Sequence, residues 1–469
     1  MHTSTTSTEP LVSWTVAQLL EATQGYWLND QAPNTEIKRI LTDSRDAEAG
    51  DAFLALKGER FDAHAFITQV AEQGCQVAIV SQPIDAEICQ LVVPDTRLAL
   101  GQLGAYRRAQ NPQLKVIALT GSSGKTTTKE MLGSILSRIA PTLVTRGNLN
   151  NDLGVPVMLL ELRPEHQYAV MELGASHQGE IDYTSNLVQP LVAGIINIGT
   201  AHLGEFGGRD GICRAKSEIY AHIAPNGTSI VPAADDFADS IRQAVQTEQV
   251  LGFGAGGEIF ATEIELQAQS ATFKLNTPQG VRQVNLPFAG EHNVQNSTAA
   301  AAFALAIGIS LDDIVIGLEQ AVGAKGRLNF IQQGHHLLID DTYNANPTSM
   351  RAAAEVLAQQ EGVRVMVMGD IGELGSSAAQ QHYMLGRDLV SVKGLNFVVA
   401  VGEFAPAAQE GARSTQYGKK MQAFLTQEQA LPFLLSLIET HQPQSMSFLF
   451  KGSRYTHMET LMADLMEKL

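Results

Sequence analysis

The sequence of 469 residues contains little cysteine and no long apolar run. Its three cysteines, Cys75, Cys89 and Cys213, include no CxxC pair, so we expect neither a disulfide framework nor a structural zinc site. No uncharged apolar stretch approaches the ~20 residues that a membrane-spanning helix needs. The polar start, MHTSTTSTEPLVSWT, lacks the apolar segment of a signal peptide. These absences predict a cytoplasmic protein with no stable membrane insertion.

Positive charge is also scarce in this chain. It has 32 Lys and Arg against 49 Asp and Glu, a formal net charge of −17. Nucleic acid is therefore not an expected partner, because phosphate contacts along a nucleic acid need clustered Lys and Arg. The composition is otherwise that of an ordinary globular protein, and the length suggests about three domains.

The order of strand and helix patterns predicts an α/β fold in three domains. Short apolar runs alternate with helical patterns in residues 1–110, which suggests a small α/β domain. From Lys115 onward, buried strands alternate with amphipathic helices, and this indicates a parallel sheet with helices on both faces. Residues 258–288 alternate around a PQG turn instead and predict antiparallel strands. We place a polar linker at 106–115, a central domain at 111–329 and a C-terminal Rossmann-like domain at 330–469.

A phosphate-binding loop is the strongest motif. It reads TGSSGKT, residues 120–126, follows a buried strand and opens a helix. Its glycines allow backbone N–H groups to turn toward phosphates, and the helix N-terminus adds partial positive charge. Lys125 would neutralise the terminal phosphates and the Thr126 hydroxyl would reach Mg²⁺. The loop is shorter than GxxxxGK[ST], because Leu119 stands where the first glycine would be.

Two further side chains follow strands that should end at the same edge of the sheet. Glu172 ends YAVMELG, and His202 comes just after IINIGTAH. A carboxylate suits Mg²⁺ well, and a histidine suits it less. Taken alone, Glu172 would be read as a helix cap, His202 as a packing residue and Lys216 as a solvated lysine on a helix. The phosphate loop is what favours the metal-site interpretation of the first two.

The motifs together resemble those of the Mur ligase superfamily, which includes the folylpolyglutamate synthases. The resemblance rests on TGSSGKTTTKE, GNLNNDLGVP, MELGAS, NIGTAHL, AKSEI, GEHNVQN and GRLNF, in that order and spacing. The N-terminal DSR and GDAFLALKGERFDAH are similar to the uridine-diphosphate-binding domain of the muropeptide branch. The C-terminal DDTYNANPTSM, VMGDIGELG and FKGSRYTHME are most similar to the branch that adds D-alanyl-D-alanine to UDP-N-acetylmuramoyl-tripeptide. The similarity covers nearly the whole chain.

The resemblance implies roles for individual residues and implies ATP and Mg²⁺ as cofactors. ATP would contact Gly121, Ser122, Ser123, Gly124, Lys125, Thr126 and Thr127, with Asn293 and Asn296 at the adenine, Asp341 at the ribose and Arg327 at the phosphates. Magnesium would be bound by Thr126, Glu172, His202 and Lys216, the last matching a lysine that is carbamylated in some members. The muropeptide would contact Ser44, Arg45, Asn148 and Asn151. The catalytic set would be Lys125, Glu172, His202, Lys216 and Arg327.

The implied reaction is ATP-dependent formation of an amide through an acyl-phosphate, by a monomer. We expect the dipeptide to bind to loops of the C-terminal domain, with Asn344, Asn346, Lys451 and Arg454 as candidates, since amides pair with a peptide backbone and arginine with a carboxylate. TYNANPTS is equally readable as a turn and helix cap. Alternatives are another amino-acid-adding ligase, a folylpolyglutamate synthase, or a P-loop switch that is not a ligase.

Overall fold

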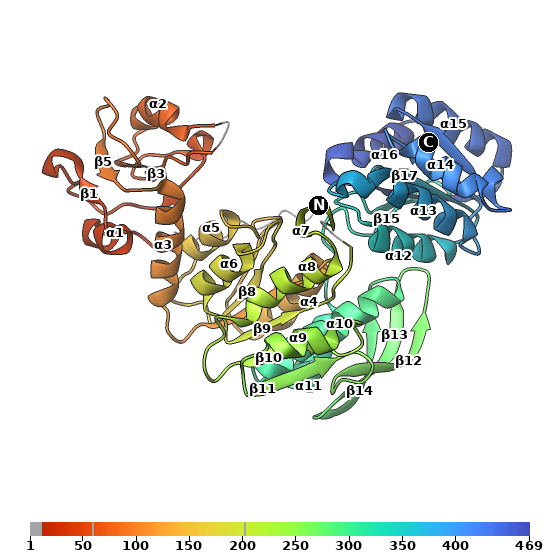
Figure 1. Ribbon diagram of the computed structural model, residues 1–469, viewed down its shortest axis with the longest axis horizontal. Helices are drawn as coiled ribbons and strands as arrows, with labels where there is room; N and C mark the ends of the chain where they lie inside the picture. The colour runs from red at the N-terminus through yellow and green to blue at the C-terminus, as the bar shows by residue number, and fades with distance from the viewer. Residues whose placement is uncertain (1–11, 59–60, 201–202) are drawn as a thin grey trace. The chain divides into compact units, whose positions relative to one another are not determined.

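The computed structural model describes residues 12–58, 61–200 and 203–469. Many of its helices and strands are labelled in Figure 1. Two compact units can be separated, one of Met1–Ala118, Ala140–Ala175 and Glu180–Pro190, and the other of Leu119–Ile139, Ser176–Gly179 and Leu191–Leu469. None of the helices in the described ranges is both long enough and apolar enough to cross a membrane.

The N-terminal sheet has the order β1-β5-β4-β3-β2, and only β1 runs antiparallel to its neighbour. Apolar side chains of α1 and α3 pack on one face, and those of α2 pack on the other. The strands are β1 (Tyr26–Trp27), β2 (Ile40–Leu41), β3 (Ala52–Leu54), β4 (Val77–Val80) and β5 (Cys89–Val92). The helices are α1 (Val16–Thr23), α2 (Ile67–Glu72) and α3 (Thr96–Ala109), with short 3₁₀ turns η1 (Leu28–Asp30), η2 (Ser44–Asp46) and η3 (Ala63–Phe66).

The central sheet has the order β11-β10-β9-β6-β8-β7, with the strand that leads into the phosphate loop, β6, in the interior. Every residue of β6 except Lys115 is buried, as expected for an inner strand of a parallel sheet. The strands are β6 (Lys115–Thr120), β7 (Thr142–Val144), β8 (Tyr168–Glu172), β9 (Val192–Ile195), β10 (Thr228–Pro232) and β11 (Gln249–Phe253). The helices are α4 (Lys125–Ser137), α5 (Gly154–Leu160), α6 (Glu180–Val188), α7 (Leu203–Phe206), α8 (Arg209–Ser217), α9 (Ala238–Ala244), α10 (Glu291–Ala306) and α11 (Leu311–Glu319), with the 3₁₀ turn η4 (Glu218–Tyr220).

The segment near 258–288 forms the antiparallel sheet that its alternation predicted. It consists of β12 (Phe260–Leu266), β13 (Ala271–Thr277) and β14 (Gly280–Leu286), in that order. Phe273, Leu275 and Val284 are buried on one face.

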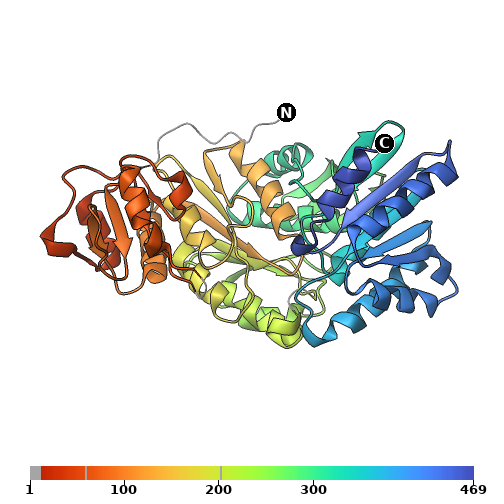
Figure 2. The same cartoon turned by 90° about the horizontal axis from the view of Figure 1, so that it is seen from above.

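The C-terminal sheet has the order β15-β16-β20-β17-β18-β19, parallel except for β15 at its edge. Helices lie on both faces (Figures 1 and 2): α12, α13 and α14 share one apolar core with the sheet, and α15 and α16 share the other. The strands are β15 (Asn329–Gln333), β16 (His336–Asp340), β17 (Val363–Gly369), β18 (Phe397–Val401), β19 (Met421–Phe424) and β20 (Met446–Lys451). The helices are α12 (Pro347–Ala358), α13 (Ala378–Ser391), α14 (Ala405–Arg413), α15 (Gln427–His441) and α16 (Met458–Met466), with 3₁₀ turns η5 (Gly375–Ser377), η6 (Gly418–Lys420) and η7 (Arg454–Thr456).

The expected linker at 106–115 is in part helical, because α3 continues to Ala109. Tyr106 and Arg107 explain this extension. The Tyr106 ring lies 5.9 Å from that of Trp14, and the Arg107 guanidinium lies 4.0 Å from the Trp14 ring centroid. Tyr106 and Arg107 cover the Trp14 side chain of the N-terminal domain. Their polar ends suggested a linker, but this packing keeps them in the helix.

Candidate active site

The phosphate loop lies between β6 and α4, as the sequence predicted. Gly124 has φ +77°, and a Cβ at this position would lie 2.2 Å from Asn296 Oδ1, so only glycine fits between the loop and α10. Lys125 begins α4, and its Nζ donates to the Gly121 carbonyl at 2.8 Å, across the loop. A lysine, backbone N–H groups and a helix N-terminus therefore converge on one small volume suited to phosphate.

The end of β9 supports the phosphate loop. Asn197 Oδ1 accepts the Ser123 N–H and its Nδ2 donates to the Ser123 carbonyl, both at 3.0 Å, while the Ser122 N–H donates to the Asn197 carbonyl at 3.1 Å. Behind this segment, Arg209 donates to the Ile198 carbonyl at 2.6 Å and also pairs with Asp236. Asn197 therefore fixes both polar backbone groups of Ser123. Sequence reasoning quoted NIGTAHL but singled out only its histidine.

Replacing Asn197 with aspartate should weaken ATP binding. Aspartate keeps the acceptor for Ser123 but loses the donor and adds a negative charge beside the phosphate loop. We expect the KM for ATP to rise by roughly 10-fold, the worth of one or two hydrogen bonds, and steady-state kinetics with varied ATP measures it. Asn276→Asp is the matched control, because the Asn276 amide bonds only within the antiparallel sheet. An unchanged KM for ATP in Asn197→Asp would show that the loop does not need this amide.

The start of α10 carries the two asparagines expected at the adenine. Asn293 and Asn296 are both buried, and Asn296 Nδ2 donates to Asn293 Oδ1 at 3.0 Å. Asn293 Nδ2 donates in turn to the Ala289 carbonyl at 2.8 Å. Burial, with a smaller contribution from Lys451, lowers the pKa of the adjacent His292 to about 4, so this imidazole is neutral at pH 7. The two hydrogen bonds fix the Asn293 and Asn296 side chains, and the contact of these side chains with adenine stays a prediction.

Arg327 reaches the phosphate loop across 201 residues of sequence. Its Nη2 donates to Thr126 Oγ1 at 3.0 Å, and its guanidinium carbon lies 4.3 Å from the centre of the Tyr343 ring. The structure therefore brings together two residues that sequence reasoning assigned to the phosphates and the metal. Tyr343 was not singled out from the sequence.

Asp341 and Lys451 form a buried ion pair. Lys451 Nζ lies 2.6 Å from Asp341 Oδ2 and also donates to the Asn344 carbonyl at 2.9 Å. The side chains are 5% and 11% exposed, so Lys451 holds the loop after β16 from within rather than lying on the surface. Burial raises the pKa of Asp341, and the neighbouring Lys451 opposes that shift. The predicted contacts of Asp341 with ribose and Lys451 with a dipeptide stay predictions.

The other candidates for the dipeptide lie on loops at the carboxyl edge of the C-terminal sheet. Asn346 caps α12 by accepting the Ser349 N–H at 2.8 Å, as the alternative reading of TYNANPTS expected. Asn344 is exposed, and Arg454 is 63% exposed and donates to Glu459 at 2.8 Å. Ser453 Oγ accepts the Gly372 N–H at 2.8 Å, which ties the loop after β20 to the loop after β17.

Glu172 ends β8 and is only 1% exposed. Asn150 Nδ2 donates to Glu172 Oε1 at 2.8 Å, and Gly174 N–H donates to the Asn150 carbonyl at 2.7 Å. Asn150 therefore orients the carboxylate, a role that sequence reasoning missed although it named the nearby Asn148 and Asn151. Asn151 accepts the Gly154 N–H at the start of α5, and Asn148 is exposed.

A magnesium site here would need oxygen ligands. Few of them need to come from the protein, because Mg²⁺ usually keeps several waters and also binds phosphate oxygens of the substrate. The Thr126 hydroxyl and the Glu172 carboxylate each carry oxygens of this kind, and their binding of magnesium stays a prediction. Lys216 lies on α8 and is 2% exposed. His202 lies outside the described residues. Within those residues, no group of three or more His, Cys, Asp and Glu side chains is arranged to hold a metal.

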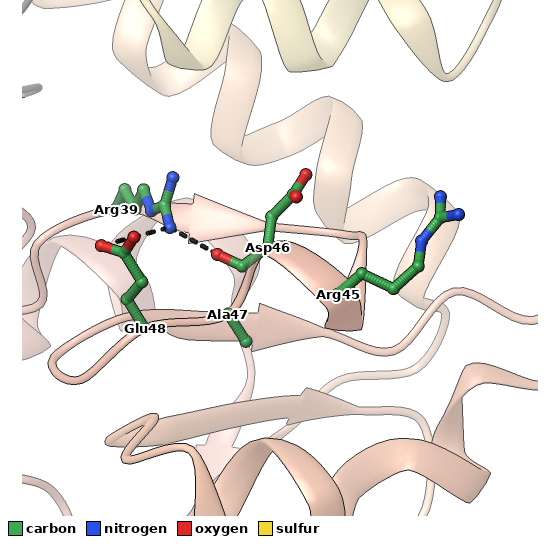
Figure 3. A pocket seen from close by; sticks show the side chains of 5 residues that line it. All are labelled: Arg39, Arg45, Asp46, Ala47 and Glu48. Atoms are coloured by element: carbon green, nitrogen blue, oxygen red, sulfur yellow. Dashed lines mark hydrogen bonds and ion pairs between the residues drawn. The ribbon is translucent and has the colours of Figure 1, made fainter.

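Ser44 and Arg45 lie on η2 in the N-terminal domain. A shallow hollow there is lined by Arg39, Arg45, Asp46, Ala47 and Glu48, and Figure 3 shows Arg39 drawn toward Glu48 while Arg45 extends away from that pair. Arg45 also bonds to Asp43, and this hydrogen bond lowers the pKa of the Asp43 carboxyl to about 2. Both arginines already have acidic partners, so the hollow is polar rather than strongly cationic.

Three family models together match most of the chain. They are the Mur ligase family catalytic domain at residues 36–118, the Mur ligase middle domain at 119–304 and the Mur ligase glutamate ligase domain at 326–454. The UDP-N-acetylmuramoyl-tripeptide–D-alanyl-D-alanine ligase of Escherichia coli is 41% identical over 97% of this chain and 99% of its own. That of Haemophilus influenzae is 39% identical over 98% and 100%.

Solved structures agree with these relatives. A crystal structure of MurF from Acinetobacter baumannii is 75% identical, covers 98% of this chain and 100% of its own, and superposes with a TM-score of 0.95. MurF from Thermotoga maritima in complex with ADP is 25% identical, covers 92% and 97%, and has a TM-score of 0.79. A folylpolyglutamate synthase of Mycobacterium tuberculosis, 16% identical with a TM-score of 0.60 over 79% and 95% of the two chains, shares the fold alone.

Proposed function

We propose residue roles for this chain from the premise that it belongs to the Mur ligase family. It is an ATP-dependent acid–amino-acid ligase of the MurF type, which adds D-alanyl-D-alanine in peptidoglycan precursor synthesis. We propose UDP-N-acetylmuramoyl-tripeptide as the acceptor, and the cytoplasm, where ATP is available, as the location. The observation that carries the assignment of residues is the contact of Arg327 with Thr126 at the phosphate loop.

The first step transfers a phosphoryl group. The tripeptide carboxylate attacks the γ-phosphorus of ATP, the bond from that phosphorus to the bridging oxygen breaks, and ADP leaves. Both reactants are anionic, so the transfer needs fixed positive charge. Lys125 and Arg327 supply it at the loop, and Asn197 keeps the loop in shape. Bound magnesium would spread the remaining charge, with Thr126 and Glu172 as its ligands.

The second step forms the amide. The amine of the dipeptide attacks the carbonyl of the acyl-phosphate, the new C–N bond forms, and inorganic phosphate leaves while the amine loses a proton. Acyl-phosphates hydrolyse readily, so the site must exclude water while the dipeptide binds. No nucleophilic side chain is required, in agreement with the absence of a GxSxG motif from the sequence.

Lys216 contributes as a carbamate. The ammonium first loses a proton, the free amine then adds to carbon dioxide, and a second proton leaves as the N–C bond forms, so the cation becomes an anionic oxygen group. A buried ammonium cannot bind magnesium, whereas a carbamate offers anionic oxygens that can. The 2% exposure of Lys216 supports this assignment, because the surroundings would shield the modification from water.

Arg454 should bind the free carboxylate of D-alanyl-D-alanine. We expect Arg454→Ala to raise the KM for the dipeptide by roughly 10- to 100-fold, the worth of charge-assisted hydrogen bonds, with the KM for ATP nearly unchanged. Arg413→Ala, which removes another exposed arginine of the same domain, is the control. If the KM for ATP alone rose, the loop after β20 would belong to the nucleotide site instead.

Phosphate release distinguishes the ligase from the alternatives. Release should require both UDP-N-acetylmuramoyl-tripeptide and D-alanyl-D-alanine. Steady release without either substrate would favour a P-loop switch, and release driven by another amino acid or by a folate would favour another branch. The matched N-terminal domain before residue 118 argues against the folate branch.

A further inference from the structure

The side chain of Arg327 lies against the aromatic ring of Tyr343, which has no part in the two steps above. The guanidinium carbon lies 4.3 Å from the centre of the Tyr343 ring, within the range of a cation–π contact. Tyr343 belongs to the loop after β16, and its N–H donates to the Gly326 carbonyl at 3.1 Å. We propose that Tyr343 is a positioning residue, which holds the Arg327 guanidinium in place for phosphoryl transfer. This inference rests on the proposed role of Arg327 and extends it.

The backbone on both sides of Arg327 is shaped to fit Tyr343. Gly326 has φ +73°, and a Cβ there would lie 3.1 Å from Tyr343 N and 3.2 Å from Tyr343 Cβ, closer than most Cβ contacts in proteins. Leu328 has φ +51°, an uncommon conformation for a residue with a side chain. Asn329 Oδ1 accepts the Gly326 N–H at 2.6 Å and closes the turn. The turn therefore presents the Arg327 side chain against the Tyr343 ring.

The guanidinium itself has few other contacts. Its Nη2 donates to Thr126, but its Nε is buried and has no hydrogen-bond partner among the residues that the structure describes. A guanidinium has five N–H donors, so the edge that faces the loop retains donors for phosphate oxygens. The ring meanwhile covers one face of the guanidinium and limits how far this long side chain can swing.

Asp341 could compete for the Arg327 guanidinium, but it is already paired with Lys451. The Asp341 carboxylate is close enough to Arg327 for the two charges to interact, but Lys451 lies 2.6 Å from it. The Tyr343 ring and the Lys451–Asp341 pair therefore act together. The ring holds the guanidinium at the phosphate loop. Lys451 pairs with the Asp341 carboxylate, which would otherwise attract the guanidinium away from the loop.

The ring face, rather than the hydroxyl, should be the functional part of Tyr343. Among the described residues, no hydrogen bond involves its hydroxyl, whereas the cation–π contact needs only the ring. Phenylalanine should therefore replace tyrosine, and leucine should not. Tyr417 offers a matched control, because its ring lies 5.0 Å from Lys420 Nζ in a similar contact within the same domain.

The test compares Tyr343→Leu, Tyr343→Phe and Tyr417→Leu in the full-length ligase. We expect Tyr343→Leu to lower kcat by roughly 2- to 30-fold, the range that cation–π contacts span, with little change in the KM for D-alanyl-D-alanine. Tyr343→Phe should recover most of the lost rate, and Tyr417→Leu should match the parent enzyme. In an Arg327→Ala background, assayed at high enzyme concentration, Tyr343→Leu should have little further effect.

Three results would overturn the inference. They are an unchanged kcat in Tyr343→Leu, an equal loss in Tyr343→Phe and Tyr343→Leu, and a full additional loss when Tyr343→Leu is combined with Arg327→Ala. Full activity of Arg327→Ala alone would instead reject the proposed role of Arg327, so the two failures can be told apart. Thermal unfolding of each variant identifies a loss that comes only from instability.

Discussion

Lys125→Ala should remove nearly all ligation activity while the protein stays folded. Lys125 is the only lysine in the phosphate loop motif, and its Nζ lies 2.8 Å from the Gly121 carbonyl, where it can shift to a phosphate oxygen. The fixed positive charge of Lys125 stabilises the transition state most, because negative charge then moves from the γ-phosphate to the leaving ADP. Loss of one such preorganised contact costs on the order of 100- to 1,000-fold in kcat. Release of phosphate in the presence of all three substrates measures it.

The control is Lys274→Ala, which removes an exposed lysine paired with Glu263 in the antiparallel sheet. This variant should retain the parental rate. Circular dichroism and thermal unfolding should show a folded Lys125→Ala protein, because Lys125 is partly exposed and its loss leaves no cavity in the core. Near-normal ligation by Lys125→Ala would mean that the nucleotide site has been placed wrongly.

Lys216→Ala should also cause a large loss, on the order of 100-fold, comparable with removal of groups that hold or orient a metal ligand. The reason is the missing carbamate oxygens rather than the missing positive charge. Short carboxylic acids such as acetate should restore part of the activity of Lys216→Ala, because they supply oxygen ligands in the space left by the side chain. Initial rates with increasing acetate measure this recovery.

Arg214→Ala is the control for Lys216, since Arg214 lies on the same helix but is exposed. It should keep its rate and show no response to acetate. A fully active Lys216→Ala enzyme would rule out the carbamate. A carbamate that is needed for turnover should also make the parental rate depend on dissolved carbon dioxide, whereas that of Lys216→Ala should not.

Regular elements and the phosphate loop could be predicted because their signals are local. The buried run of β6 and the glycines, lysine and threonine after it fall within a dozen residues, and each has its own steric or electrostatic reason. The alternation at 258–288 predicted antiparallel strands for the same reason. The edge strand β15 and the end of α3 depended on packing partners far away in sequence, which a local pattern does not contain.

The supporting residues of the site could not be predicted from their own neighbourhoods. Asn197 and Asn150 are unremarkable as single residues, and their functions come from contacts 74 and 22 residues away. Lys451 was proposed as a substrate contact because it lies where a predicted strand of the C-terminal domain ends in a loop. The fold instead pairs it with Asp341 across 110 residues, a partner that only the parallel pairing of β16 and β20 brings close.

Mass spectrometry of the products formed from carboxylate-labelled UDP-N-acetylmuramoyl-tripeptide, ATP and D-alanyl-D-alanine tests the central claim most directly. With heavy oxygen at both positions of the terminal carboxylate, an acyl-phosphate route predicts a product heavier than the labelled tripeptide by the dipeptide less one labelled water. ADP and inorganic phosphate carrying one labelled oxygen should form with it. Label in AMP, or phosphate that contains no label, would contradict the account.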